Sequence, residues 1–169
     1  MLNGKRILAI IPARAGSKRV QHKNLTLFKI GDEMDSLLGW AIKHAKACKY
    51  IDHTVISSDL PQQCKEGPYS EPEWFPRPEY LSGDKTPMEA VLTHVLYRCS
   101  GYDYAVLLQP TSPLRSAEDI NHCIEIAVTQ DGKDGLTGCV SYNPYGKRNG
   151  AVYVMNRLHF LEFLSLDAA

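Results

Sequence analysis

The sequence contains neither a long apolar run nor a leader-like beginning. Its longest apolar run, residues 7–13, is far shorter than the ~20 residues that a membrane-spanning helix needs, and Pro12 interrupts it. The residues before this run do not have the charged, apolar and small-residue regions of a signal peptide. We therefore expect a cytoplasmic protein that has no membrane partner.

The spacing of metal-ligating residues is absent as well. The five cysteines and six histidines form no CxxC and no HxxxH pair, so neither a zinc site nor a histidine metal site is supported. An odd number of cysteines at these spacings also argues against a disulfide framework. We expect small, reduced core residues, and the cysteines are Cys48, Cys64, Cys99, Cys123 and Cys139.

The chain carries no net charge, because 19 Lys and Arg residues balance 19 Asp and Glu residues. This balance argues against a protein that coats polyanions. It hides a local asymmetry, since residues 1–29 contain seven Lys and Arg residues but no Asp or Glu. No aromatic side chain precedes Phe28, so this basic segment lacks stacking platforms and does not favour a nucleic-acid partner. Four of its cations crowd one loop and favour a smaller polyanion: Arg14, Lys18, Arg19 and Lys23.

The length and the periodicity predict one α/β domain. A chain of 169 residues suits a single domain, so residues 1–169 are taken as one unit. Apolar, β-branched runs predict strands, and segments with a 3.6-residue apolar period predict helices between most of them. The predicted strands cover residues 7–11, 54–58, 104–108, 136–141 and 151–155. This alternation predicts a three-layer α/β/α sandwich with a mainly parallel sheet.

Capping residues mark where the helices are predicted to begin. Thr86 is a predicted N-cap, followed by Pro87 at the first helical position and Glu89, which completes a capping box. The other predicted caps are Ser36, Ser116 and Asn156. Residues 61–80 contain five prolines, so we expect no regular element there.

The unusual residues lie where such a sheet binds ligands, beyond the carboxyl ends of its strands. The loops that leave these ends are residues 12–24, the residues from Asp59 onward, and residues 109–115. In the first loop, small residues let the backbone approach a ligand, Ser17 adds a hydroxyl group, and the cations can spread along a triphosphate. The loop matches neither the P-loop pattern nor the GxGxxG pattern, which argues against an ATPase or a dinucleotide-binding site.

Four motifs follow one another along the chain. They are IIPARAGSKR at residues 10–19, with KNL at 23–25, then RPEYLSGD at 77–84, LLQPTSPLR at 107–115 and RNGAVYV at 148–154. In this order they resemble the motifs of the CMP-N-acylneuraminate cytidylyltransferases, which act on sialic acids and other nonulosonic acids. The resemblance implies a Rossmann-like sheet of the nucleotide-diphospho-sugar transferase type. It also implies that CTP and a nonulosonic acid give a CMP-sugar and pyrophosphate, with Mg²⁺ as the cofactor.

The resemblance assigns roles to residues of the first loop. Arg14, Ser17 and Asn24 would hold the phosphates and the ribose of CTP. Lys18 and Lys23 would add positive charge at the triphosphate, and Arg14 and Lys23 are the implied catalytic residues. Charge of this kind suits a reaction in which the phosphoryl oxygens gain negative charge.

The later motifs supply the remaining implied contacts. Arg77 and Thr86 would line the cytidine side, and Gln109 would hydrogen-bond the nonulosonic acid. Thr86 has a competing role as a helix cap. Neither the metal ligands nor the general base is assigned by the resemblance.

The sequence departs from the family pattern at two places. Relatives have a long insertion before the NGA strand, which provides sugar contacts and the homodimer interface, whereas only residues 142–148 fill that space here. Relatives also continue to an acidic DxD-type element that binds the metal, whereas here Asp167 stands alone near residue 169. We therefore expect that the chain does not form the usual dimer of the family, that its metal binding is incomplete, and that it binds CTP better than it turns over the sugar.

Two other functions stay open beside the sialic-type cytidylyltransferase. One is a catalytically impaired relative that only binds a nucleotide. This function is supported by Asp167, which stands alone where relatives have the acidic DxD-type element. The other is a nucleotidyltransferase for another 3-deoxy-ulosonic acid, against which the QPTSPLR motif argues.

Overall fold

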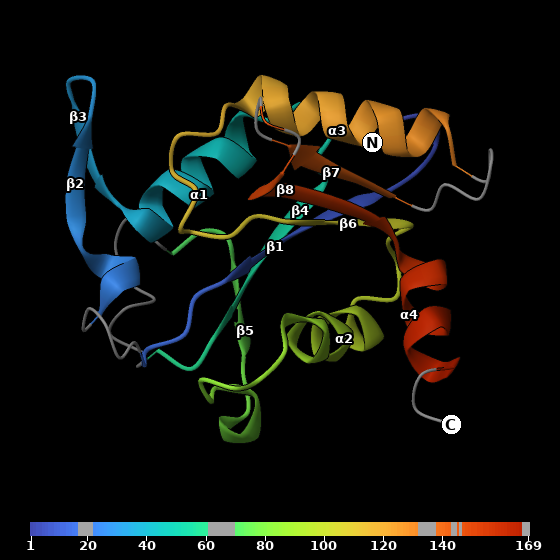
Figure 1. Cartoon of the computed structure of the whole chain (residues 1–169), viewed down its shortest axis with the longest axis horizontal. Helices are drawn as coiled ribbons and strands as arrows, with labels where there is room; N and C mark the ends of the chain where they lie inside the picture. The colour runs from blue at the N-terminus through green and yellow to red at the C-terminus, as the bar shows by residue number, and fades with distance from the viewer. Residues whose placement is uncertain (17–21, 61–69, 132–137, 143–144, 146, 167–169) are drawn as a thin grey trace.

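The fold is built around one twisted sheet of six strands (Figure 1). A computed structural model describes residues 1–16, 22–60, 70–131, 138–142, 145 and 147–166. The strands of the sheet are β1 (Ile7–Pro12), β4 (His53–Ser58), β5 (Glu73–Pro76), β6 (Tyr104–Leu107), β7 (Gly138–Tyr142) and β8 (Arg148–Asn156), in the order β5-β4-β1-β6-β8-β7. Strands β5, β4, β1 and β6 are parallel, whereas β8 is antiparallel to both β6 and β7. The predicted mainly parallel sheet is confirmed.

Helices cover both faces of this sheet. On one face lie α1 (Leu37–Ala47) and α3 (Ala117–Thr129), and on the other lie α2 (Met88–Arg98) and α4 (Arg157–Leu166) (Figure 1). Every residue of β1 is buried, as expected for an apolar strand at the centre of a parallel sheet. Its side chains alternate between two cores, one with α1 and α3 and one with α2. The predicted three-layer arrangement is therefore confirmed.

Three of the predicted helix caps are present. Ser36 Oγ accepts a hydrogen bond from the Gly39 amide at 2.9 Å. Ser116 and Asp119 form a complete capping box at the start of α3. Asn156 Oδ1 accepts bonds from the amides of Leu158 and His159 at 3.0 and 3.3 Å, so it caps α4. In each case the side chain satisfies backbone donors that the helix leaves unpaired.

The predicted cap at Thr86 is wrong. Helix α2 begins at Met88, and its N-cap is Pro87, whose ψ of 146° is extended rather than helical. A turn between Gly83 and Thr86, closed by the Thr86 amide, holds Thr86 outside the helix. The Thr86 hydroxyl donates instead to the Tyr80 carbonyl at 3.5 Å. The tight turn thus takes precedence over the local capping pattern.

Two strand features lie outside the sequence predictions. A hairpin of β2 (Leu27–Ile30) and β3 (Glu33–Ser36) projects from the body of the molecule (Figure 1). The expectation that residues 61–80 form no regular element is wrong, because β5 and the short 3₁₀ helix η4 (Glu79–Leu81) lie there. A second 3₁₀ helix, η1 (Lys23–Leu25), follows the first loop. Strand β5 is at the edge of the sheet. A proline is tolerated there, because no second neighbouring strand needs a hydrogen bond from the amide that proline lacks.

Candidate functional site

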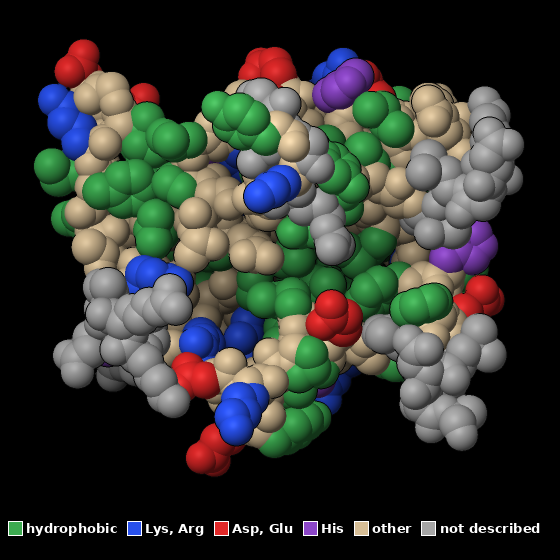
Figure 2. Space-filling model, viewed as in Figure 1, with side chains coloured by type: hydrophobic (Ala, Val, Ile, Leu, Met, Phe, Trp, Pro, Cys, Tyr) green, Lys and Arg blue, Asp and Glu red, His purple; other side chains and the backbone are tan. Residues whose placement is uncertain are grey.

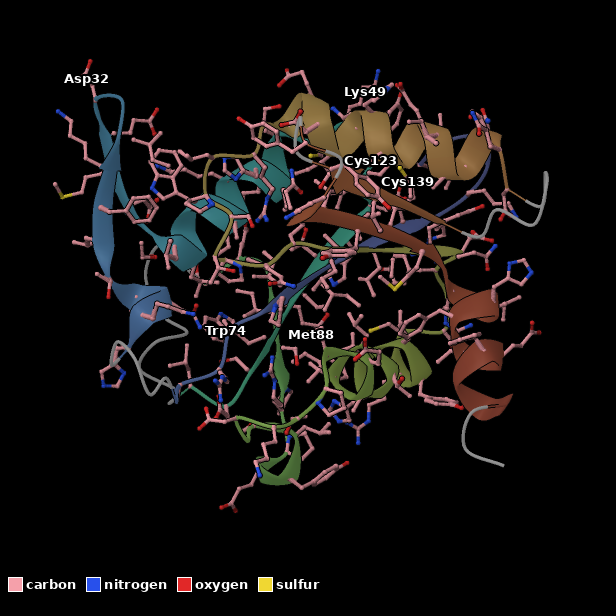
Figure 3. All side chains as sticks on the ribbon, viewed as in Figure 1. Asp32, Lys49, Trp74, Met88, Cys123 and Cys139 are labelled. Carbon is pink, nitrogen blue, oxygen red and sulfur yellow. The ribbon has the colours of Figure 1, made fainter. Side chains whose placement is uncertain are left out.

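A cleft lies at the carboxyl ends of β1 and β6, where the sequence predicts a site. Its volume is about 140 Å³. On the face seen in Figure 2, Lys and Arg side chains gather around a hollow at the lower left. Met88, labelled in Figure 3, lines the cleft from the first turn of α2. Five of the predicted site residues line it together: Arg14, Lys23, Asn24, Arg77 and Gln109.

Arg14 is held across the cleft by the segment that follows β5. Its Nη1 donates to Asp84 Oδ1 at 2.7 Å and to the Ser82 carbonyl at 3.4 Å. About a third of each charged side chain of this pair is exposed, so a ligand in the cleft can reach it. The buried Asn24 supports the same loop, because its Nδ2 donates to the Arg14 carbonyl at 3.1 Å. The first loop is thus tied to residues about 70 positions away in the sequence.

Arg77 is a buried cation in the cleft wall. It is 7% exposed, and its Nε and Nη2 donate to the hydroxyl and the carbonyl of Ser57, at 3.2 and 2.7 Å. Burial lowers the pKa of Arg77, the negative charge of Asp59 raises it, and nearby Arg14 lowers it. Asp59 also accepts a hydrogen bond from the Ala15 amide at 2.7 Å. This side of the cleft therefore has a positive charge with a fixed orientation.

Gln109 lines the cleft from the loop after β6, a strand that lies on the other side of β1 from β4 and β5. Its carbonyl accepts bonds from the Ser112 amide at 3.2 Å and from Arg115 Nη1 at 2.8 Å. Its side-chain oxygen accepts from the Thr111 hydroxyl at 3.5 Å. The residues of this loop that line the cleft, Gln109, Pro110 and Thr111, are uncharged. The cleft is therefore basic on one side and polar but uncharged on the other.

The structure does not bring all predicted residues into the cleft. Thr86 is not among the residues that line it. Ser17 and Lys18 lie outside the described residues. Sequence reasoning missed the partner of Arg14, Asp84, and the partner of Gln109, Arg115, although both stand in motifs that were noticed. No sequence pattern indicates either contact, because Asp84 is 70 positions from Arg14 and the Arg115 contact depends on the conformation of its loop.

A resident metal site is not formed by the described residues. No group of three His, Cys, Asp or Glu side chains among them could hold a metal ion. Two carboxylates flank the cleft, but Asp59 accepts the Ala15 amide and Asp84 pairs with Arg14. Mg²⁺ is commonly bound through one or two carboxylates together with substrate phosphates. The donor set described here does not fit a dedicated Mg²⁺ site, and no chemical step below depends on one.

Comparisons with known proteins identify the family of the chain. The protein-family model described as cytidylyltransferase matches residues 8–140. The chain is 34% identical over 125 residues to the CMP-N,N'-diacetyllegionaminic acid synthase of Legionella pneumophila, covering 72% of this chain and 53% of that protein. It is 26% identical over 187 residues to the N-acylneuraminate cytidylyltransferase of Escherichia coli, covering 92% of this chain and 43% of that protein. The chain thus spans about half the length of these curated relatives.

A solved structure supports the fold. The CMP:2-keto-3-deoxy-manno-octonic acid synthetase complexed with CTP matches with a TM-score of 0.68 and 16% identity, covering 96% of this chain and 78% of that chain. At this identity the likeness shows the fold alone. In the part of this chain that the structure describes, no helix combines the length and the apolar character needed to cross a membrane.

Proposed function

Because the chain belongs to the cytidylyltransferase family, we propose that it transfers the cytidylyl group of CTP to a nonulosonic acid and releases pyrophosphate. The observation that carries this proposal is the two-sided cleft, with Arg14, Lys23 and Arg77 in one part and Gln109 in another. Fixed cations suit a triphosphate, and an uncharged amide suits the hydroxyl groups of a sugar. The acceptor class is supported by relatives named for neuraminic, legionaminic and pseudaminic acids.

The basic side would bind CTP. Arg14 and Lys23 are the proposed catalytic residues, because fixed cations near the phosphates stabilise the charge that develops on the phosphoryl oxygens and on the leaving pyrophosphate. Asn24 would hold the ribose or a phosphate, and Arg77 would face the cytidine. Ser17 and Lys18 keep their proposed phosphate contacts, although they lie outside the described residues. Thr86 has no place in this proposal, since it does not line the cleft.

The proposed chemistry is a single displacement at phosphorus. The anomeric oxygen of the sugar acid forms a bond to the α-phosphorus of CTP, and the bond from that phosphorus to the bridging oxygen of pyrophosphate breaks. The hydroxyl proton of the sugar is released to water, and pyrophosphate leaves with the electron pair of the broken bond. The protein contributes positioning and fixed positive charge, which are the main contributions to catalysis of phosphoryl-type transfers.

The remaining features of the proposal concern cofactor, partners and location. Mg²⁺ is the proposed cofactor, held chiefly by the phosphate oxygens of CTP when bound. The proposed partners are the two substrates, with neither nucleic acid nor membrane, and the proposed location is the cytoplasm. Residues 142–148 are short compared with the insertion that forms the dimer interface in relatives. We therefore propose that the chain does not form the usual dimer of its family.

Product analysis with a panel of acceptors tests the proposal. CTP is incubated with N-acetylneuraminic, legionaminic or pseudaminic acid, or with a shorter 3-deoxy-ulosonic acid, and both pyrophosphate and the CMP-sugar are measured. The proposal expects both products with at least one nonulosonic acid. Products with only the shorter acid would favour the second enzymatic function. CTP binding with no product from any acceptor would favour the catalytically impaired relative.

A further inference from the structure

Arg115 is a buried cation that does not line the cleft. It closes the loop of residues 109–115 and is only 5% exposed. None of the ion pairs found among the described residues includes it. Its Nε and Nη2 are buried and have no hydrogen-bond partner among the described residues. Burial lowers the pKa of Arg115 to about 10, which still leaves it protonated at neutral pH.

The third guanidinium nitrogen of Arg115 joins two segments of the site. Nη1 donates to the Gln109 carbonyl at 2.8 Å and to the Ala151 carbonyl of β8 at 3.1 Å. A second link joins the same segments, because the Ser112 hydroxyl donates to the Gly150 carbonyl at 3.3 Å. The loop after β6 is therefore fastened to β8 at its last residue, Arg115, and in its middle, at Ser112. Gln109, which lines the cleft, is one of the two residues held.

Burying a guanidinium group without a carboxylate partner is energetically unfavourable. An apolar side chain of similar length would fill the same space without this penalty. What an apolar side chain cannot do is to hold two backbone carbonyls at a fixed separation. The charge of Arg115 thus has a geometric consequence, because it fixes the backbone from which the Gln109 side chain projects.

We infer that Arg115 is a positioning residue for the acceptor side of the cleft, which sets the place of Gln109 by clamping its carbonyl to that of Ala151. This inference rests on the proposed function, because it assigns to Gln109 the contact with the sugar acid. The nucleotide side has its own support, in which Arg77 is bonded to Ser57 and Arg14 to Asp84. Loss of the Arg115 clamp therefore disturbs one substrate and leaves the other in place.

Steady-state kinetics of Arg115→Met, Arg115→Lys and Leu114→Ala test the inference. Leu114 is the matched control, because it neighbours Arg115 in the same loop but is 81% exposed. In Arg115→Met we expect the KM of the sugar acid to rise about 10-fold, the loss given by about 1.4 kcal/mol of binding, with the KM of CTP within about twofold of the native value. Arg115→Lys keeps one cationic donor and should recover part of this loss. Leu114→Ala should leave both KM values unchanged.

A purely structural role for Arg115 gives a different result. If Arg115 only stabilises the fold, its substitution reduces the amount of folded enzyme, so the maximal rate falls while both KM values stay unchanged. This outcome would overturn the inference. An equal rise in both KM values would overturn it as well. If Arg115→Met does not fold, the comparison of Arg115→Lys with Leu114→Ala decides in the same way.

Amide hydrogen exchange separates this inference from the proposed function. In Arg115→Lys, exchange should become faster in peptides that cover residues 109–115 and 149–153 but not in those that cover residues 54–60. This readout needs no turnover. Native protein that makes no CMP-sugar would overturn the proposed function, and faster exchange confined to these two segments would still support the clamp. Unchanged exchange, or exchange that increases throughout the sheet, would refute it.

Discussion

The cations of the cleft differ in how firmly they are held. Arg77 is buried and donates twice to Ser57, so its orientation is set before any ligand arrives. Arg14 is partly exposed and paired with Asp84, and a triphosphate must compete with this carboxylate for it. Because a partly exposed ion pair contributes little to stability, phosphate oxygens can replace Asp84 as the partner of Arg14 at a small cost in free energy. Arg14 is therefore the residue whose loss should most directly weaken nucleotide binding.

We predict that Arg14→Ala weakens CTP binding by at least about 10-fold, since hydrogen bonds to charged groups contribute about 1.5–3 kcal/mol. Calorimetry measures the affinity, and thermal unfolding checks that the variant folds. The control is Lys29→Ala, because Lys29 is an exposed cation of β2 that pairs with Asp32, three residues away, at 3.4 Å. Equal CTP affinity in Arg14→Ala and in the native protein would show that Arg14 is not a phosphate ligand.

We predict that Gln109→Ala raises the KM of the sugar acid by roughly 3–10-fold and leaves the KM of CTP within about twofold, because one neutral hydrogen bond contributes about 0.5–1.5 kcal/mol. The matched control is Gln130→Ala, an exposed glutamine that follows α3. Initial rates with each substrate varied in turn give both constants. If the two KM values rise together, Gln109 does not belong to the acceptor side.

The elements show which parts of the fold follow from local sequence. Ser116 caps α3 as predicted, because its bonds join residues three positions apart. Thr86 has an equally good local pattern, but a turn that starts at Gly83 holds it away from α2. Strand β5 could not be predicted, because its pairing with β4 and its edge position decide whether a proline-rich stretch becomes a strand.

The same distinction holds for the site. The cleft could be placed from the sequence, because the carboxyl ends of parallel strands meet at one edge and the motifs follow those ends. The contacts of Arg14 with Asp84 and of Arg115 with Ala151 could not be predicted. They join segments that are far apart in the chain, and no periodicity or spacing records such a pairing.

Helix α1 supplies a pH-sensitive group beside Arg115. The His44 ring stacks on Trp40, with 6.1 Å between the ring centroids. Burial lowers the pKa of His44 from 6.5 to about 4, and the positive charges of Arg115 and Lys43 add to this effect. Between these two pH values the unfolded chain binds a proton that the folded chain does not bind. Neutral His44 therefore stabilises the folded state fully above pH 6.5, and this contribution to the free energy of unfolding is lost progressively as the pH falls toward 4.

We predict that the free energy of unfolding falls by on the order of 2–3 kcal/mol on acidification through this range because of His44 alone. His44→Phe keeps an aromatic ring against Trp40 and should remove most of this pH dependence. His159→Phe is the control, because His159 is exposed in α4. Urea unfolding at a series of pH values gives the free energies. The same acid loss in His44→Phe as in the native protein would refute the assignment.

At the scale of the whole molecule, the strand order brings the substrate-binding loops together. Strand β1 lies between β4 and β6, so the loops after β1, β4 and β6 meet at one edge of the sheet. Strand β8 runs antiparallel beside β6 and presents its first residues at that same edge. Three of the four motifs that resemble the cytidylyltransferases thus supply residues to one cleft, and the fourth is hydrogen-bonded to the loop after β6. The family expected from these motifs is confirmed.

We predict that the chain is a monomer of 18.9 kDa at micromolar concentration. The connection from β7 to β8 is short, since Tyr142 already pairs with Arg148 across the two strands. A connection of this length buries too little surface for a stable interface, which needs about 1,200 Å². Light scattering measures the mass directly. Twice this mass at micromolar concentration would show that another surface of the chain forms the dimer.

Amide chemical shifts recorded by NMR test the central claim most directly, which is that one cleft binds CTP on its basic side and a sugar acid on its uncharged side. CTP is added first and the nonulosonic acid second. We expect CTP to shift the amides of residues 13–16, 22–24, 57–60 and 77, and the sugar acid then to shift those of residues 109, 111, 112, 114, 115 and 149–152. Shifts from both ligands confined to another part of the chain, or no shift with either one, would contradict this account.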